Sequence, residues 1–215
     1  MSVPGTWTTR ALLTAAIPLA LVSGCAERGQ LSPGGYAGAE LTGPRPKPEF
    51  VLTSMRGGSF DFRRQTDGYV TLLFFGYTHC PDVCPVHMAN IGAVLDRLPF
   101  DVSSRVRVVF VTTDPSRDTP ERLRTWLGGF SHDFIGLTGT RDQVTQAQIA
   151  AGVLPAVPDT ADSATGDYGV GHAAQVLAYT PDNLERVEYP SGTRQEDWAH
   201  DLPMLVRVRA RSDTS

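Results

Sequence analysis

Two apolar runs stand out in the middle of the chain. They cover residues 69–77 (YVTLLFFGY) and 106–113 (VRVVFVTT), and both are rich in β-branched and aromatic residues. Short, nearly continuous runs of this kind predict strands that are buried on both faces of a sheet. Between them, residues 86–98 carry apolar side chains at helical spacing, which predicts a helix. The core of the chain is therefore expected to begin as strand, helix, strand.

Turn and capping residues mark the elements around this core. Residues 50–62 read as two short strands around a Gly-Gly turn, an N-terminal β-hairpin. Thr119 followed by Pro120 predicts a helix start, because threonine caps helices and proline suits the first helical position. Capping-box patterns predict two further helix starts, at Thr140 and at Thr193.

The last third of the chain completes the pattern. Residues 153–171 have no apolar period, and we expect a long loop there. Residues 173–189 predict a hairpin that turns at residues 181–183, and residues 194–208 predict a final helix. Alternating strands and helices imply an α/β fold with a mixed central sheet and flanking helices on both faces. Such a unit, closed by a hairpin and a helix, resembles the thioredoxin fold.

The first residues have a different pattern. A mostly apolar stretch over residues 11–22 follows one basic residue, Arg10. The stretch is shorter than the ~20 residues of a membrane-spanning helix, and it predicts a signal peptide over residues 1–24. The VSGC sequence that ends at Cys25 resembles the lipobox of bacterial lipoproteins and predicts lipidation of that cysteine. The alternative is an ordinary signal peptide whose first mature residue happens to be cysteine.

Beyond the signal peptide, the chain divides into three expected parts. Residues 25–48 are expected to be the lipidated cysteine and a flexible tether, because residues 26–48 are rich in glycine and proline and show no apolar period. A folded domain is expected over residues 49–209, and a short C-terminal tail over residues 210–215. Together, the anchor at Cys25 and the tether predict a position on the extracytoplasmic face of the bacterial cell membrane.

Charge narrows the classes of partner. The formal net charge is -4, and no run of basic residues is longer than two. A nucleic-acid partner is therefore not expected. With 41% hydrophobic and 20% charged residues, the composition suits one globular domain with an ordinary core.

Cys80 and Cys84 lie where the first buried strand gives way to the helix, in the sequence FGYTHCPDVCP. A helix start favours anions, so it stabilises thiolates. Pro81 and Pro85 restrict the backbone after each thiol. Because thiolates both attack disulfides and bind metals, three interpretations stay open: a structural disulfide, a redox dithiol and a metal site. Haem attachment is excluded, because no C-x-x-C-H sequence occurs.

A metal site needs a further donor, and the chain has five histidines. In a thioredoxin-like sheet the loop before the late strand passes over the dithiol, and His172 lies in that loop. His79 and His87 offer an alternative, a local zinc site with two cysteines and two histidines. We expect His132 and His200 to be ordinary surface or core residues. Two sulfurs and one imidazole form a soft, low-coordinate site that favours Cu(I) and also tolerates Cu(II).

Three features together resemble a known family. The sequences FFGYTHCPDVCP and VTTDPSRDTPERL, and a histidine before an apolar strand, are similar to the SCO/SenC family of copper proteins over roughly residues 48–208. The resemblance implies a membrane-tethered, thioredoxin-like domain that binds copper and helps to assemble the dinuclear copper centre of cytochrome c oxidase. Carried over to this sequence, it implies Cys80, Cys84 and His172 as copper ligands, with the two cysteines also able to form a reversible disulfide.

The same resemblance implies roles for nearby acidic residues. Asp82 would lie beside the ligands or face a partner, and Asp114 and Asp118 of the second motif would lie beside the ligands. The chain departs from the family at Gly171, where many members have an aspartate directly before the ligand histidine. That difference removes a carboxylate that would orient the imidazole, and it leaves the copper affinity open.

Two functions of different classes agree with these residues. The first is a copper chaperone that receives copper from an upstream donor protein and passes it to cytochrome c oxidase subunit II by exchange of thiolate ligands. The second is a thiol-disulfide reductase, in which Cys80 attacks a disulfide of the oxidase copper site and Cys84 resolves the mixed disulfide. His172 separates the two, because a copper site needs it and a reductase does not.

Overall fold

One mixed sheet of eight strands and a separate pair of short strands form the fold of the computed structural model, which describes residue 1 and residues 30–159 and 168–208. The strands are β1 (Ala39–Pro46), β2 (Val51–Ser54), β3 (Ser59–Asp61), β4 (Val70–Gly76), β5 (Val106–Thr112), β6 (Ile135–Thr138), β7 (Val157–Pro158), β8 (Val170–Gly171), β9 (Val176–Tyr179) and β10 (Leu184–Tyr189). The helices are α1 (Phe62–Gln65), α2 (Val83–Leu95), α3 (Phe100–Ser103), α4 (Pro120–Gly128), α5 (Arg141–Ala150) and α6 (Gln195–Leu205).

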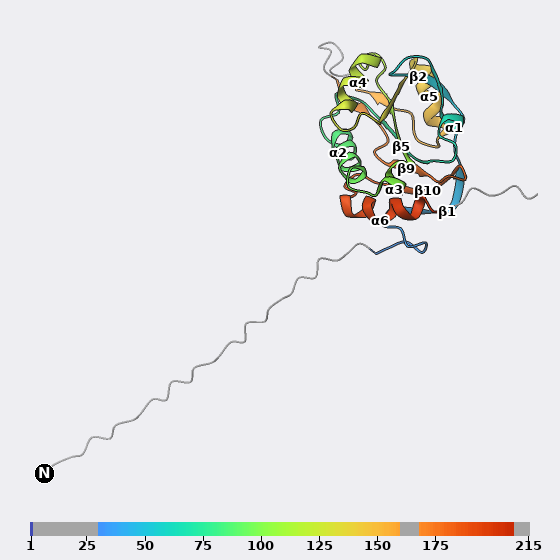
Figure 1. Cartoon of the computed structure of the whole chain (residues 1–215). Helices are drawn as coiled ribbons and strands as arrows, with labels where there is room; N and C mark the ends of the chain where they lie inside the picture. The colour runs from blue at the N-terminus through green and yellow to red at the C-terminus, as the bar shows by residue number, and fades with distance from the viewer. Residues whose placement is uncertain (2–29, 160–167, 209–215) are drawn as a thin grey trace, which may run out of the picture.

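The eight strands of the main sheet lie in the order β1-β10-β9-β4-β5-β6-β2-β3 (Figure 1). β4 pairs in parallel with β5, and β5 with β6, whereas the other neighbours pair antiparallel. β2 and β3 form the predicted N-terminal hairpin. The prediction of a mixed central sheet is therefore confirmed. β7 and β8 pair antiparallel within the segment that was expected to be only a loop.

Successive side chains of β4 point to opposite faces of the sheet, and each face has its own core. Leu72 and Phe74 pack with residues of α2, α4 and α6, whereas Leu73 and Phe75 pack with residues of α1 and α5. Figure 1 shows α2 and α4 on one side of the sheet and α1 and α5 on the other. All seven residues of β4 are buried, which explains why its apolar run is continuous rather than alternating.

Two of the three predicted helix starts are confirmed. Thr119 caps α4 with its side chain, and Thr140 begins α5 with a capping box. The third prediction is wrong by one residue, because the hydroxyl of Thr193 donates to a carbonyl oxygen of the preceding turn. The capping residue of α6 is Arg194, whose amide donates to the Asp197 carboxylate at 3.0 Å.

β1 corrects the predicted tether. Residues 39–46 were expected to be flexible, yet they pair with β10 at the edge of the sheet. The register shifts between Glu40 and Arg45, and exposed and half-buried positions follow no regular alternation. Before the strand, Tyr36 is already part of the core. The folded part of the chain therefore begins before residue 49, where the domain was expected to start.

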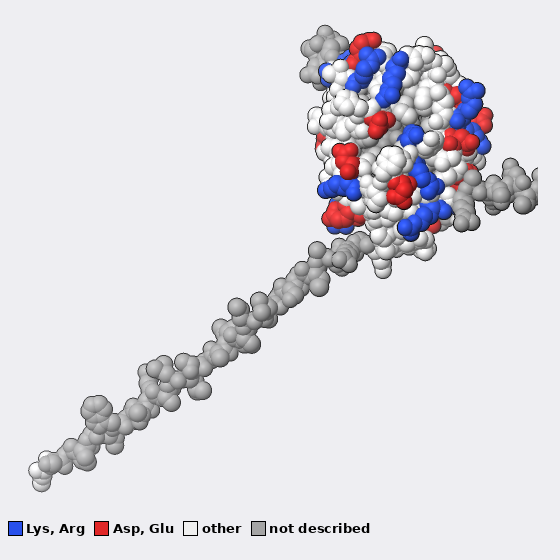
Figure 2. Space-filling view, viewed as in Figure 1, with Lys and Arg blue, Asp and Glu red and all other residues white. Residues whose placement is uncertain are grey.

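Charged side chains of both signs are mixed over the face of the molecule that Figure 2 shows. Within the described ranges, no helix combines the length and the hydropathy that a membrane crossing requires. The predicted signal peptide, Cys25 and the predicted tail over residues 210–215 lie outside the described residues.

Candidate metal centre

The loop between β4 and α2 carries both cysteines of the site. β4 ends at Gly76 and α2 begins at Val83, so Cys84 lies in the first turn of the helix and Cys80 in the loop before it. The Cys80 amide donates to the Tyr77 carbonyl oxygen at 3.2 Å and closes a turn. Both cysteines are free thiols, with Cys80 8% exposed and Cys84 fully buried. Whether they form the predicted reversible disulfide stays a prediction.

Gly76 allows the helix start to pack closely on the end of β4. A Cβ atom at this position would lie 2.8 Å from Cys84 Sγ and 2.7 Å from a ring carbon of Phe74. Both distances are shorter than non-bonded contacts of Cβ atoms, so a side chain there would displace the thiol. The glycine of the FFGYTHC sequence is therefore required by the position of Cys84.

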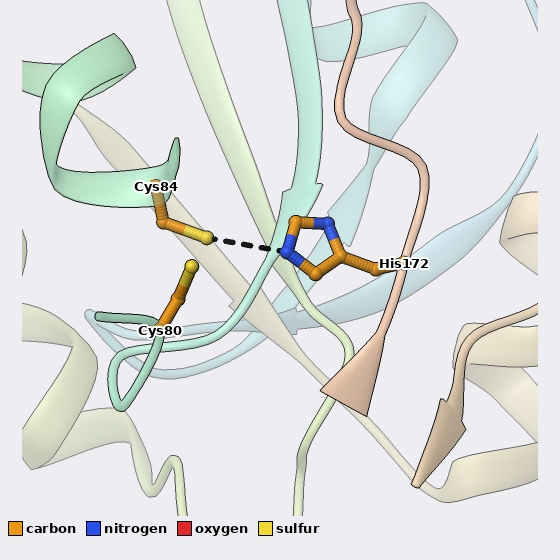
Figure 3. Close-up of side chains that lie close together, drawn as sticks. All are labelled: Cys80, Cys84 and His172. Carbon is orange, nitrogen blue, oxygen red and sulfur yellow. Dashed lines mark hydrogen bonds between the residues drawn. The ribbon is translucent and has the colours of Figure 1, made fainter. Parts of the chain in front are cut away.

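His172 reaches the thiols from a distant part of the chain. It directly follows β8, and its side chain points toward the two sulfur atoms (Figure 3). His172 Nε2 lies 3.5 Å from Cys84 Sγ, and one ligand atom from each of the three residues lies within 4.8 Å of the other two. In the part of the chain that the structure describes, only this group brings three or more such side chains close enough to share a metal ion.

Backbone and aromatic contacts fix the orientation of the imidazole. Nδ1 of His172 lies 2.9 Å from the Ala173 carbonyl oxygen. Because a carbonyl only accepts, Nδ1 carries a proton, and Nε2 is the ring nitrogen that faces the sulfurs. The rings of Phe74 and Tyr77 pack edge-on against the imidazole. The Ala173 carbonyl thus provides the orienting acceptor that Gly171 does not.

The two thiols form an unequal pair. A hydrogen bond from the Cys84 thiol lowers the pKa of Cys80 far below its usual value, against the effect of burial, and His172 lowers it further. The same hydrogen bond, together with burial, raises the pKa of Cys84. Burial lowers the pKa of His172, but the Cys80 thiolate and the Ala173 carbonyl outweigh it, so the net shift is upward. The apo pair is therefore one thiolate held by one thiol.

Asp118 binds the cysteine loop through hydrogen bonds from Thr78. Its carboxylate is fully buried and accepts hydrogen bonds from the Thr78 amide at 2.9 Å and the Thr78 hydroxyl at 2.6 Å. It also accepts from the Thr112 hydroxyl, at the end of β5, at 2.7 Å. Thr78 lies two residues before Cys80, so this carboxylate ties the thiol-bearing loop to the neighbouring strand.

Asp114 holds the histidine side of the site. Its carboxylate accepts from the Arg117 guanidinium and, at 2.9 Å, from the Tyr168 hydroxyl. Arg117 also donates to the Tyr168 carbonyl oxygen at 2.8 Å, and its guanidinium carbon lies 3.6 Å from the centre of the Tyr168 ring. The sequence analysis missed Tyr168. It stands in a segment without period, and its partner Asp114 is 54 residues away, so no local pattern identifies it.

The other candidate residues do not join the cluster. Asp82 stands at the N-cap of α2, but it is exposed and its side chain makes no capping hydrogen bond. The side chain of His79 is 40% exposed, and its Nδ1 lies 3.7 Å from Asp118. His87 is buried, which lowers its pKa, and its Nε2 lies 3.0 Å from the Ala174 carbonyl oxygen. The alternative of a local zinc site is therefore not formed.

The donor set fits a soft ion of low coordination number. Two thiolate sulfurs and one imidazole nitrogen suit Cu(I), and thiolate with imidazole also suits Cu(II). Structural zinc usually takes four protein ligands, and the described residues bring only three together here. Because burial and the hydrogen bond to Cys80 raise the pKa of Cys84, metal loading requires the loss of the Cys84 proton, which couples metal binding to pH.

Comparison with known proteins identifies relatives over the whole fold. A sequence model described as SCO1/SenC matches residues 39–207. The chain is 36% identical over 141 residues to the mitochondrial SCO2 homolog of Homo sapiens, a match that covers 63% of this chain and 50% of that protein. The solution structure of apo Sco1 from Thermus thermophilus superposes with a TM-score of 0.70 at 30% identity, covering 79% of this chain and 96% of that one.

A copper-bound relative has the same architecture. The structure of Bradyrhizobium japonicum ScoI with copper bound superposes with a TM-score of 0.64 at 32% identity, covering 76% of this chain and 98% of that one. The chain matches only 34% to 65% of the length of the first curated relatives. The fold that it shares with these structures confirms the predicted thioredoxin-like architecture. This chain belongs to the SCO1/SenC family.

Proposed function

We propose that this protein binds copper through Cys80, Cys84 and His172 and delivers it to the dinuclear copper centre of cytochrome c oxidase subunit II. The observation that carries the proposal is the convergence of the three donor atoms within 4.8 Å. Two relatives with the same fold, from Bradyrhizobium japonicum and yeast, are described with copper bound. The link to the oxidase rests on the family to which the chain belongs.

The geometry suits a carrier better than a permanent metal site. Cys84 is fully buried at the helix start, whereas Cys80 lies in a loop and keeps 8% exposure. An acceptor thiolate would therefore replace Cys80 first, and the sulfur that leaves would be stable as a thiolate because its pKa is low. Stepwise exchange of this kind moves copper between proteins without releasing it to solvent. An upstream donor protein would load the site by the reverse exchange.

The same dithiol favours a second candidate function, a thiol-disulfide reductase. The Cys80 thiolate would attack one sulfur of a disulfide in the acceptor and form a mixed disulfide, releasing one acceptor thiolate. Cys84 would then lose its proton and attack Cys80, releasing the second acceptor thiolate and leaving a Cys80–Cys84 disulfide. The observation in its favour is the low pKa of the partly accessible Cys80. In this role His172 is not needed as a ligand and serves only to lower the pKa of Cys80 further.

An anaerobic titration separates the two functions. The reduced protein, with Cys25→Ser so that two thiols remain, is titrated with Cu(I) against a competing chelator. We expect one tight equivalent, weakened about ten-fold or more by His172→Ala, because loss of a ligand should cost at least as much as loss of an outer-shell partner. The exposed His132 provides the matched control, and His132→Ala should bind like the parent protein. Weak binding that is indifferent to His172 would refute the copper site and favour the reductase.

We also propose that the protein is a lipoprotein anchored through Cys25 on the extracytoplasmic face of a bacterial membrane. The support is the lipobox-like VSGC sequence after a short apolar stretch. With Tyr36 in the core, an anchor at Cys25 would stand about ten residues before the folded domain. Membrane association that persists in the Cys25→Ser protein would contradict the anchor.

A further inference from the structure

The three ligand candidates come from two separate pieces of chain. The cysteines belong to the loop and helix that follow β4, whereas His172 follows β8, 88 residues after Cys84. A metal site functions only when its donors are held within about 0.5 Å of their productive positions. The two pieces must therefore be held at a fixed distance from each other. Both of them are bound to one short segment, residues 114–118, which follows β5.

The cysteine piece is bound through Asp118. Its buried carboxylate takes three hydrogen bonds, two of them from Thr78. The Thr78 hydroxyl also accepts a hydrogen bond from Arg122 Nε at 3.0 Å, so it is held from two sides. These contacts fix the backbone two residues before Cys80.

The histidine piece is bound through Asp114 and Arg117. Asp114 is 2% exposed and accepts from the Tyr168 hydroxyl, while Arg117 donates to the Tyr168 carbonyl oxygen and stacks on its ring. Arg117 also lies 5.9 Å from the centre of the Tyr77 ring, whose edge contact supports the imidazole of His172. Tyr168 is four residues before His172, so it fixes the approach of the histidine arm.

We propose that residues 114–118 set the spacing between the cysteine and histidine halves of the site, with Tyr168 as the positioning residue of the histidine half and Thr78 as that of the cysteine half. The inference rests on the proposed copper function, which it deepens by assigning separate tasks to the two halves. Neither positioning residue touches the ligand atoms. Tyr168 acts only through the placement of His172, and Thr78 acts only through the placement of Cys80.

Tyr168→Phe tests the histidine half, because it removes the hydroxyl and keeps the ring. Copper affinity should fall roughly ten-fold, as is typical when an outer-shell partner of a ligand is lost. The reduction potential of the dithiol should shift less than in Thr78→Val, since the cysteine loop has its own support. Tyr69→Phe is the matched control, because Tyr69 stands just before β4, at the end of that strand that is remote from the site. The copper affinity of this variant should equal that of the parent protein.

A double-variant comparison separates positioning from general destabilisation. In a His172→Ala background, Tyr168→Phe should have no further effect on copper affinity, because the side chain that it positions is absent. Equal weakening in both backgrounds would overturn the assignment of Tyr168. Unchanged affinity of Tyr168→Phe in the parent background would overturn it as well.

Thr78→Val tests the cysteine half, with Thr78→Ser as the conservative variant that keeps the hydroxyl. Thr78→Val should shift the reduction potential of the dithiol and weaken copper binding in both the parent and the His172→Ala backgrounds, and Thr78→Ser should restore both quantities. A potential that is indifferent to Thr78→Val would overturn this half of the proposal.

Failure of the copper function would be visible separately. If the parent protein binds no copper, the proposed function is wrong, and the positioning roles can still be measured in the apo protein. Magnetic resonance contacts between the His172 and Tyr77 rings should then weaken in Tyr168→Phe and persist in Tyr69→Phe. Contacts that are unchanged in Tyr168→Phe would overturn the role of Tyr168 without reference to metal.

Discussion

Lys47 is a buried cation remote from the metal centre. It is 1% exposed, and its Nζ lies 2.9 Å from the Thr66 carbonyl oxygen, 3.2 Å from the Thr66 hydroxyl and 3.1 Å from the Thr71 hydroxyl. Burial is the main cause that lowers the pKa of Lys47 to about 8. No carboxylate accepts a hydrogen bond from Nζ among the described residues, so desolvation outweighs the distant attraction of Asp67.

This lowered pKa predicts a dependence of stability on pH. An unfolded lysine titrates near 10.4, so between pH 8 and pH 10.4 the unfolded chain binds more protons than the folded one. The free energy of unfolding should therefore rise with pH in this window. Relative to Lys47→Met, the parent protein should gain about 2 kcal/mol between pH 7 and pH 10 in urea unfolding. A difference between the two proteins that does not vary with pH would show that Lys47 titrates normally.

Individual residues also differ in how far the sequence predicts them. Cys80 and Cys84 follow from their place between an apolar strand and a helix start, and His172 follows from the expected path of the chain in a thioredoxin-like sheet. Tyr168 does not follow, because its contacts with Asp114 join residues 54 positions apart and leave no periodic trace. Residues that position a ligand thus depend on tertiary contacts, whereas the ligands themselves are recognisable from their chemistry.

At the scale of elements, β1 shows where an apolar pattern fails as a guide. The predicted strands β4 and β5 are central and buried, so burial on both faces imposes a continuous apolar run. β1 is an edge strand with a register shift, and its sequence AELTGPRP is polar and contains glycine and proline. It is held by backbone pairing and by contacts beyond its own residues, which a local pattern does not reveal.

Asp201 in α6 supplies one of these contacts. Its fully buried carboxylate accepts from the Ala37 amide at 2.9 Å, the Gly38 amide at 3.0 Å and the Tyr189 hydroxyl at 2.9 Å. His200 Nδ1 lies 2.7 Å from the same carboxylate. Thus α6 fixes the residues that lead into β1, and it does so across more than 160 positions of sequence.

Asp201→Asn should loosen the start of β1. The amide replaces one acceptor oxygen by a donor, so buried backbone N–H groups lose a partner, which typically costs about 1–3 kcal/mol. Hydrogen exchange at Ala37 and Gly38 should accelerate more than exchange in β4. Asp197→Asn, the same substitution one turn earlier in α6, is the control, because the hydrogen bonds that Asp197 accepts among the described residues come from Arg194 at the helix start. Equal acceleration in both variants would argue against a specific role of Asp201.

At the scale of the whole molecule, the prediction of a central sheet with flanking helices is confirmed, because the alternation of strands and helices restricts the possible topologies. The three strand-helix units and the closing hairpin appear in the predicted order. The pair formed by β7 and β8 and the early start of the sheet at Ala39 were not predicted, since short or irregular strands carry little pattern. Of these, β8 lies in the segment that brings Tyr168 and His172 to the metal centre.

Copper and the disulfide should therefore constrain the whole chain to different extents. A Cys80–Cys84 disulfide closes a loop of a few residues, whereas copper bound to all three ligands also joins Cys84 to His172, 88 positions away. Loop-closure entropy grows with the logarithm of loop length, so the longer closure should constrain the unfolded chain by roughly 3 kcal/mol more. In urea unfolding, we expect the free energy of unfolding to increase from reduced apo protein to oxidised protein to copper-loaded protein.

Copper-loaded His172→Ala provides the decisive comparison for this order. Both proteins are unfolded with copper in excess, so that the ion stays bound to the unfolded chains and the comparison reports the cross-link rather than mass action. Without the imidazole, copper joins only the two cysteines, and the variant should resemble the oxidised protein because both carry a short cross-link. If the copper-loaded parent protein gains no more stability than copper-loaded His172→Ala, the ion does not connect the distant halves of the molecule. A larger free energy of unfolding for the copper-loaded parent protein than for copper-loaded His172→Ala would show that one ion links the helix start of α2 to the end of β8. The ion would then stabilise the fold between these two points.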